Sequence, residues 1–198
     1  MVWVLVAVVA VVVLVVASII VMYNSLVRAR HNYRNAYAQI DVQLSRRHDL
    51  IPNLVEVAKA YLRHEQNTLV AVVDARSAAI QARQGAVPGD PRGMAMLAGA
   101  ENALTGSIGQ LFMVSEGYPE LKSSQNMRQL AEELTSAENR VAFARQAYND
   151  AIMLYSNKRD TFPSNLISNM FSFGPAAYLE LDEPRKRDAP QISLGRDD

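Results

Sequence analysis

Apolar residues fill the first stretch of the chain without interruption. From Val2 to Met22 there is no charge, and Ser18 is the one polar side chain. As a helix this stretch extends about 31 Å, close to the roughly 30 Å hydrocarbon core of a bilayer. We therefore predict a transmembrane anchor over residues 1–23. The side chains expected in lipid include Val2, Trp3, Leu14 and Met22.

A cleaved signal peptide is the competing interpretation of this stretch. Such a peptide has basic residues before an apolar core of about 7–15 residues, followed by a small-residue cleavage site. Nothing basic precedes the apolar run here, and the run is longer than such a core. A site at residues 15–17 would cut inside it. The pattern favours a retained anchor.

Beyond the anchor, apolar residues recur every three or four positions, which is typical of amphipathic helices. A first helix is predicted to continue from the span through residues 26–48, with cationic side chains at its C-terminal end. Asp49 is expected to cap a second helix, with Pro52 in its first turn. The apolar spacing carries this second helix from residue 51 to residue 80.

Glycine and proline mark the next boundaries. Residues 85–93 read as a loop, and Asp90 followed by Pro91 predicts the cap and first turn of a third helix. Three glycines within that helix allow either close helix packing or a flexible segment. A fourth helix over residues 127–155 has alternating steps of three and four, typical of a bundle seam.

A short amphipathic segment follows Pro163, which ends the fourth helix. Residues 164–173 place four apolar side chains on one side of a short helix. These residues are Leu166, Ile167, Met170 and Phe171. The segment can dock back onto the bundle, lie in the membrane interface, or form a partner-binding patch.

These elements together define the expected architecture. No strand-like alternation of any length is present, so the predicted class is all-α. We expect an N-terminal transmembrane helix followed by an antiparallel bundle of three to four long helices. The predicted divisions are an anchor over residues 1–23, a bundle over 24–178 and a polar, disordered tail over 179–198.

Charge changes this picture in two ways. Arg28, Arg30 and Arg34 follow the span, and no basic residue precedes it, so the positive-inside rule predicts an outside N-terminus and a cytoplasmic bundle at the cell (inner) membrane. The formal net charge is zero, which argues against a nucleic-acid partner. The chain has no cysteine, which excludes disulfides, thiolate metal sites and lipoprotein processing.

Motifs of catalysis and cofactor binding are missing from the sequence. There is no nucleotide fingerprint, and Thr68 stands where a zinc-protease motif beginning at His64 needs its second histidine. No glutamate is followed by histidine three residues later, as a di-iron bundle requires. We therefore predict no catalytic residue, cofactor, metal or small-molecule substrate. The acidic stretch Glu132–Glu138 is expected to be solvated or to contact arginines across the bundle.

Residues around the predicted helix junction are the candidate interaction site. Arg46, Arg47, Asp49 and Asn53 lie where one helix is expected to end and the next to begin. Asp49 and Asn53 can satisfy free backbone donors there. The alternative is a partner-recognition loop at the membrane-distal end. The apolar side chains Leu166, Ile167, Met170 and Phe171 are the second candidate surface.

Several long segments resemble one bacterial family. They are Tyr23–Val27, Ile40–Val55, Tyr118–Lys122, Glu132–Arg140, Tyr148–Ala151 and Phe162–Ile167. In this order they resemble the LemA family, over a match running from the anchor to about Tyr178. The resemblance implies a single-pass anchor, an extracytoplasmic N-terminus and a cytosolic all-α bundle without established enzymatic activity. One branch of that family is linked to magnetosome membrane formation.

Two functions follow as hypotheses. The first is a non-enzymatic membrane scaffold whose partners are the lipid bilayer and either further copies of itself or another membrane protein. The second, drawn from the genomic neighbours of the family it resembles, is an adaptor or regulator of a membrane protease or envelope-stress system. An enzyme of unrecognised type would have to use His64, Glu65 and the stretch Glu132–Glu138.

Overall fold

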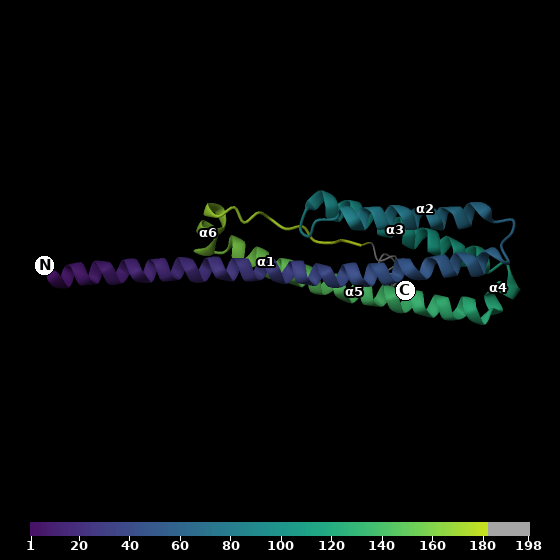
Figure 1. The fold of residues 1–198 in the computed structure, drawn as a ribbon, viewed down its shortest axis with the longest axis horizontal. Coiled ribbons are helices and arrows are strands. Elements are labelled where there is room, and N and C mark those ends of the chain that lie inside the picture. The colour runs from purple at the N-terminus through teal and green to yellow at the C-terminus, as the bar shows by residue number, and fades with distance from the viewer. Residues whose placement is uncertain (182–198) are drawn as a thin grey trace, which may run out of the picture.

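The computed structural model describes residues 1–181, and every regular element within them is an α-helix (Figure 1). The helices are α1 (Val2–Lys59), α2 (Gln66–Gly85), α3 (Pro91–Ser115), α4 (Pro119–Ser123), α5 (Gln125–Asp160) and α6 (Ser164–Met170). The predicted all-α class is confirmed.

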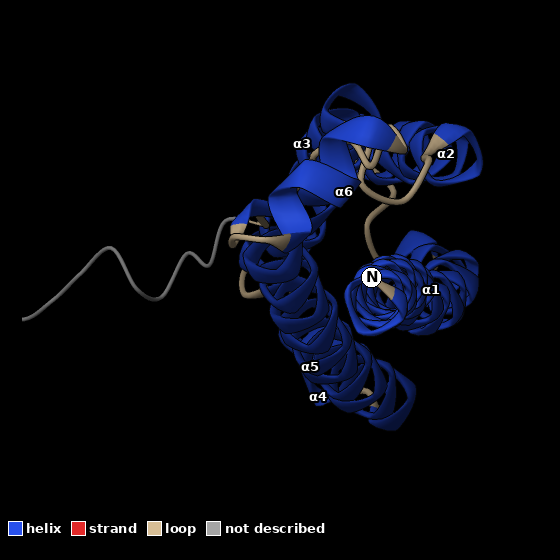
Figure 2. Cartoon of the chain, turned by 90° about the vertical axis from the view of Figure 1, so that its left-hand side faces the viewer, coloured by secondary structure: helices blue, strands red, loops and turns tan. Residues whose placement is uncertain are grey.

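The long helices lie side by side and alternate in direction. α1 runs away from the N-terminus, α2 returns, α3 runs outward again and α5 returns, with the short α4 at the far end (Figure 1). α1 packs mainly on α5, and α2 packs mainly on α3. Viewed end-on, α2 and α3 lie together to one side of α1 (Figure 2). The predicted helical bundle behind an N-terminal apolar helix is confirmed.

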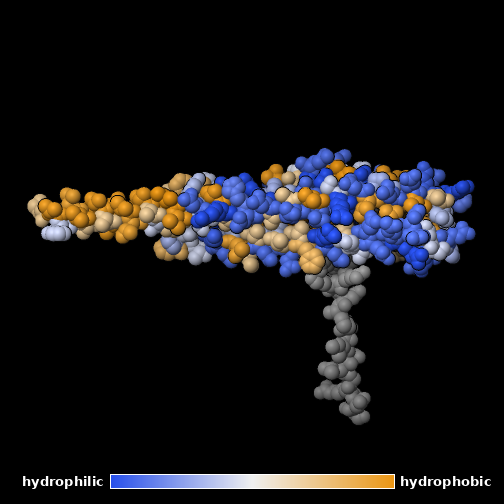
Figure 3. Space-filling view, turned by 60° about the horizontal axis from the view of Figure 1, so that its bottom comes forward, coloured by the Kyte–Doolittle hydropathy of each residue, from blue (hydrophilic) through white to orange (hydrophobic). Residues whose placement is uncertain are grey.

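The first part of α1 projects beyond the bundle as an apolar rod (Figure 3). Its most apolar window has a mean hydropathy of 3.5, and none of that window is buried within the protein. Val2, Trp3 and Leu14 are largely exposed, whereas Met22 packs against the core of the body. A core helix would bury such side chains, so the rod has the length and composition of a membrane span.

The buried core falls into two parts along the bundle. The part nearer the rod includes the aromatic rings of Tyr33 and Tyr148. The far part includes Ile51 and Leu104. Buried charged or titratable side chains lie between the two parts: Arg47 and His48 on α1, and Glu101 on α3.

The predicted helix junction at Asp49 is wrong, because α1 continues to Lys59 with Pro52 inside it. Proline lacks an N–H group, so the carbonyl of His48, four residues earlier, loses its helical partner. Arg76 of α2 replaces that partner, since its Nε donates to the His48 carbonyl oxygen at 2.8 Å. This hydrogen bond offsets part of the roughly 3 kcal/mol that proline costs inside a helix.

The chain turns between α1 and α2 at residues 60–65, so the predicted helix over residues 51–80 is interrupted. This turn contains neither glycine nor proline. Leu62 is fully buried within it, and Leu69 follows on the buried side of α2. The apolar spacing therefore continues through the turn, which explains the failure of the pattern.

The start of α3 is confirmed, but of the two explanations offered for its glycines the structure does not support close packing. Asp90 Oδ2 accepts a hydrogen bond of 2.6 Å from the Gly93 N–H, and Pro91 occupies the first turn. Gly99 and Gly106 have open space where a Cβ atom would lie. Close packing between helices of this chain therefore does not account for these two glycines.

After α6 the chain runs back along α5 as an extended strap, residues 174–181 (Figure 1). Leu179 is fully buried, its N–H donates to Asn149 Oδ1 at 3.0 Å, and its carbonyl accepts from Asn149 Nδ2 at 3.2 Å. Arg145 Nη1 donates to the Leu181 carbonyl at 2.7 Å. The packed body thus passes the predicted boundary at residue 178. The rest of the predicted tail lies outside the described residues.

Candidate functional site

Arg47 is the centre of a polar layer that joins three helices. It projects from α1 and is 3% exposed. Its Nη1 donates to Glu101 Oε2 on α3 at 3.0 Å. Its Nη2 donates to Thr105 Oγ1 on α3 at 2.7 Å and to Glu138 Oε1 on α5 at 3.0 Å. The predicted contact between the acidic stretch of α5 and an arginine across the bundle is confirmed for Glu138.

The carboxylate of Glu101 is fully engaged within this layer. Its second oxygen, Oε1, lies 2.7 Å from His48 Nε2, and both side chains are almost completely buried. The Thr105 hydroxyl donates to the Glu101 carbonyl at 3.0 Å, so its single proton is also committed. Arg76 of α2 reaches the same level through the His48 carbonyl. All four long helices therefore contribute to one polar layer.

This arrangement organises packing, because Arg47, His48 and Glu101 are each at most 3% exposed. If one helix slid along its neighbour by one turn, about 5.4 Å, the groups of the polar layer that now lie about 3 Å apart would no longer be in contact. Buried charges left without partners are costly, so the layer penalises such slipped arrangements. We infer that the polar layer of Arg47, His48, Glu101 and Glu138 fixes the register of α1, α3 and α5.

The other residues of the predicted junction lie on the outside of α1. Arg46, Asp49 and Asn53 are exposed, and their spacing of three and four places them on one face of the helix. None of them lies at a helix end, because α1 continues past them. The capping role predicted for Asp49 and Asn53 is therefore wrong. Their role in binding a partner stays a prediction.

The apolar side of α6 is divided between the bundle and solvent. Ile167 is buried against the core, which confirms docking of this segment. Leu166 and Met170 are 57% and 71% exposed. Phe171 is 48% exposed, and its ring lies 5.0 Å from that of Tyr23 on α1. The choice between a membrane interface and a partner patch depends on these exposed side chains.

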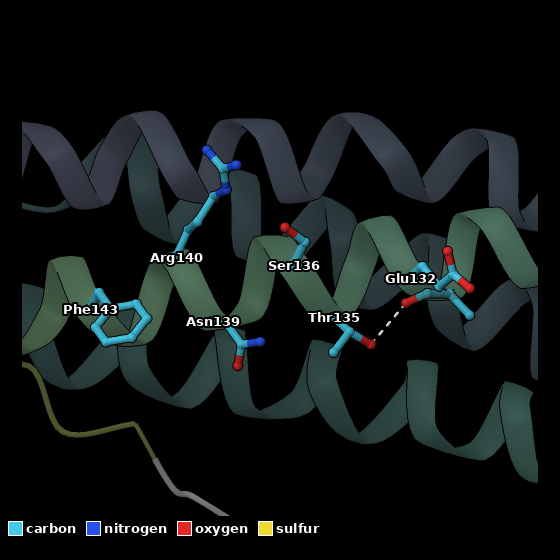
Figure 4. A pocket seen from close by; sticks show the side chains of 7 residues that line it. Glu132, Thr135, Ser136, Asn139, Arg140 and Phe143 are labelled. Atoms are coloured by element: carbon cyan, nitrogen blue, oxygen red, sulfur yellow. Dashed lines mark hydrogen bonds between the residues drawn. The ribbon is translucent and has the colours of Figure 1, made fainter.

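A shallow hollow of about 510 Å³ lies on the outer face of α5 (Figure 4). Its lining residues all come from this helix and include Glu132, Asn139, Arg140 and Phe143. Thr135 donates to the carbonyl of Ala131, within its own helix, at 2.8 Å. The hollow lies between neighbouring side chains of one helix, so it does not enclose a ligand.

The residues proposed for an unrecognised enzyme are dispersed. His64 is exposed in the turn between α1 and α2, whereas Glu132 lies on the outer face of α5. Glu65 accepts a hydrogen bond from the Tyr118 hydroxyl at 3.2 Å. Within residues 1–181, no three histidine or acidic side chains are placed to hold a metal ion. The geometry gives these groups no shared site.

A tyrosine clamp holds the strap, and the sequence analysis did not identify it. The Tyr148 hydroxyl accepts from the Gly89 N–H and donates to the Ala177 carbonyl, both at 3.0 Å. The Tyr155 hydroxyl donates to the Gly174 carbonyl at 2.7 Å. Burial raises the pKa of Tyr37, which stacks edge-on against Tyr148, to about 12. Burial likewise raises the pKa of Tyr148.

Glu101 was also missed, although the sequence carries a signal for it. Among residues 93–115 it is the one charged residue, and it falls on the apolar face with Leu97, Leu104 and Ile108. A charge at a core position calls for a buried partner. The sequence could have identified the charge, but it could not have selected Arg47 and His48 as the partners.

Comparison with known proteins matches this sequence to one family. The LemA family pattern matches residues 36–194. Magnetosome proteins MamQ 2 and MamQ 1 of Paramagnetospirillum magneticum are each 25% identical, over 90% of this chain and 71% of theirs. Magnetosome protein MamQ of Magnetospirillum gryphiswaldense is 22% identical over the same shares. This membrane-associated helical bundle belongs to the LemA family.

Proposed function

We propose that this protein is a single-pass, non-enzymatic scaffold that holds a helical bundle at the cytoplasmic face of the cell membrane. One observation carries the proposal. The apolar rod of α1 is unburied, and the same helix continues without a break into the core of the bundle. A partner bound to the bundle would therefore be held at the membrane by one continuous element.

The orientation follows from the cations beyond the rod. Arg28, Arg30 and Arg34 lie within about 18 Å of Met22 along the helix, on the side expected in the cytoplasm. From Met22 to Lys59, α1 extends about 55 Å. The bundle would thus project from the bilayer surface and present its long sides to other proteins.

The exposed face of Arg46, Asp49 and Asn53 is the proposed contact surface. It lies on α1 and mixes a cation, an anion and an amide. Interfaces of this composition gain specificity from complementary charges more than affinity from area. We propose self-association or the recruitment of another membrane protein through this face. The protease-adaptor hypothesis stays a prediction, because no contact in the described residues favours it.

Site-specific crosslinking tests the scaffold role. Arg46→Cys would be crosslinked in native membranes with a bifunctional thiol reagent, and Phe143→Cys on the outer face of α5 is the matched exposed control. The proposal expects a discrete crosslinked product at position 46 and none at position 143. Monomer alone at position 46 and at Asn53→Cys would reject this contact surface.

Protease protection tests the orientation. In intact spheroplasts, an added protease should leave the bundle uncut, and permeabilisation should expose it. Cleavage of the bundle before permeabilisation would place it outside and overturn the cytoplasmic assignment.

A further inference from the structure

Helix α6 lies at the level where the apolar rod enters the bundle (Figure 1). Ile19 and Met22, in the last turn of the apolar stretch, pack against the core cluster that contains Ile167 and Phe173. The Tyr23 ring lies 5.7 Å from the Phe173 ring. These contacts place the segment that directly follows α6 beside the end of the span.

The outward side of this region is strongly apolar. Phe162 is 75% exposed, and Leu166 and Met170 follow at intervals of four. We call Phe162, Leu166, Met170 and Phe171 the foot patch. The neighbouring Ile167 faces the bundle and is 6% exposed. α6 is thus buried on one side and presents apolar side chains on the other, next to the rod.

Cations lie on the parts of α1 and α5 that are next to the end of the span. Arg28 is exposed on α1, about 9 Å beyond Met22 along the helix. Lys158 of α5 is exposed, and its Nζ donates to Ser25 Oγ at 3.0 Å. The Arg30 guanidinium lies 4.9 Å from the centre of the Phe173 ring. Apolar side chains bordered by cations are the chemistry of segments that bind an anionic membrane interface.

We propose that the foot patch inserts into the boundary between headgroups and acyl chains of the bilayer that holds the rod. The proposal rests on the proposed membrane anchor, because the anchor brings the patch to lipid. Lipid is the chosen occupant because the patch is continuous with the span and lies within reach of the interfacial layer, about 5–10 Å deep. A second contact beside the span would limit rotation and tilt of the bundle.

Fluorescence from single cysteines in the full chain tests the proposal. The natural chain has no cysteine, so Leu14→Cys, Met170→Cys and Met113→Cys each give one labelled position. Met113 is the matched control, a methionine 66% exposed near the far end of α3. Each variant would carry bimane and be reconstituted in vesicles of phosphatidylethanolamine and phosphatidylglycerol. Quenching would be measured with a lipid-borne nitroxide near the headgroups and with aqueous iodide.

The expected result is several-fold stronger lipid quenching at position 170 than at position 113, with reduced iodide quenching at position 170. Equal lipid quenching at positions 170 and 113 would overturn the foot proposal. Shielding of position 170 from both quenchers would also overturn it, because a protein would then cover the patch. Position 14 separates the two proposals: if its label is open to iodide, the anchor itself fails.

Discussion

Replacing Glu101 with glutamine perturbs the polar layer without changing its volume. The two carboxylate oxygens now take hydrogen bonds from Arg47 Nη1 and His48 Nε2. Glutamine offers one acceptor oxygen and an NH₂ group, so His48 Nε2 would face another donor unless the ring changes tautomer and Nε2 becomes the acceptor. Arg47 would also lose its buried counter-charge, and Glu138 at the rim would be its remaining charged partner beside the neutral Thr105 hydroxyl.

Burial determines the size of the effect. Glu101 is 1% exposed, and removing one partner of a buried ion pair costs about 3–5 kcal/mol. Glu138 contacts the same arginine, but its side chain is 45% exposed, so Glu138→Gln should cost about 0–1 kcal/mol. A domain has about 5–15 kcal/mol of stability in total, so the first loss is a large share and the second is small.

Denaturant unfolding of the full chain in detergent micelles, followed by circular dichroism, measures both variants. The Arg47→Met and Glu101→Leu double variant should be more stable than Glu101→Leu alone, because the double variant leaves no buried arginine without its partner. If both glutamine variants lose less than about 1 kcal/mol of unfolding free energy, the Arg47–Glu101 pair behaves like an exposed ion pair and the argument from burial is wrong.

The remaining predictions concern other parts of the bundle. Gly99→Ala and Gly106→Ala should each stabilise the protein by about 0.5–1 kcal/mol, because both Cβ atoms would enter open space on a helix; unfolding curves showing a loss would contradict this. Burial raises the pKa of Tyr37 above its unfolded value of 10.0 to about 12, so its contribution to stability should be intact below pH 10 and lost as the pH rises toward 12. A pH titration of stability should be flatter in Tyr37→Phe, and an unchanged slope would contradict this assignment. Asn149→Ala removes two hydrogen bonds to Leu179 and should accelerate hydrogen exchange across the strap, whereas the exposed Asn139→Ala should not; equal exchange in both would contradict the clamp.

The sequence predicted those elements in which the apolar spacing and the boundary signals agree. The length of the uncharged apolar stretch predicts the rod. Asp90 followed by Pro91 predicts the cap of α3, and apolar residues at steps of three and four predict the buried face of α5. At Pro52 the two signals disagree, because the apolar spacing continues through a residue that usually ends a helix. An arginine from another helix makes this proline tolerable, and a local pattern contains no information about that contact.

Hydrogen bonds between distant parts of the chain determine the features that could not be predicted from the sequence, namely the strap and the partners of Tyr148 and Glu101. Tyr148 has an apolar spacing that predicts a core position, but its hydroxyl partners on Gly89 and Ala177 lie 59 and 29 residues away. The strap is held through its own backbone groups, which leave little trace in side-chain patterns. The partners of Glu101 likewise depend on how three helices are aligned.

A spin-label scan along α1 in proteoliposomes, with single cysteines placed from Val8 to Tyr37, shows whether one helix passes unbroken from lipid into the bundle. We expect oxygen access and no aqueous access on all sides of the rod. From Leu26 onward, accessibility should vary with a period of 3.6 residues, because one face of the helix enters the core. Aqueous access around Val12, or a break in helical periodicity near Tyr23, would contradict a continuous helix that passes from lipid into the bundle.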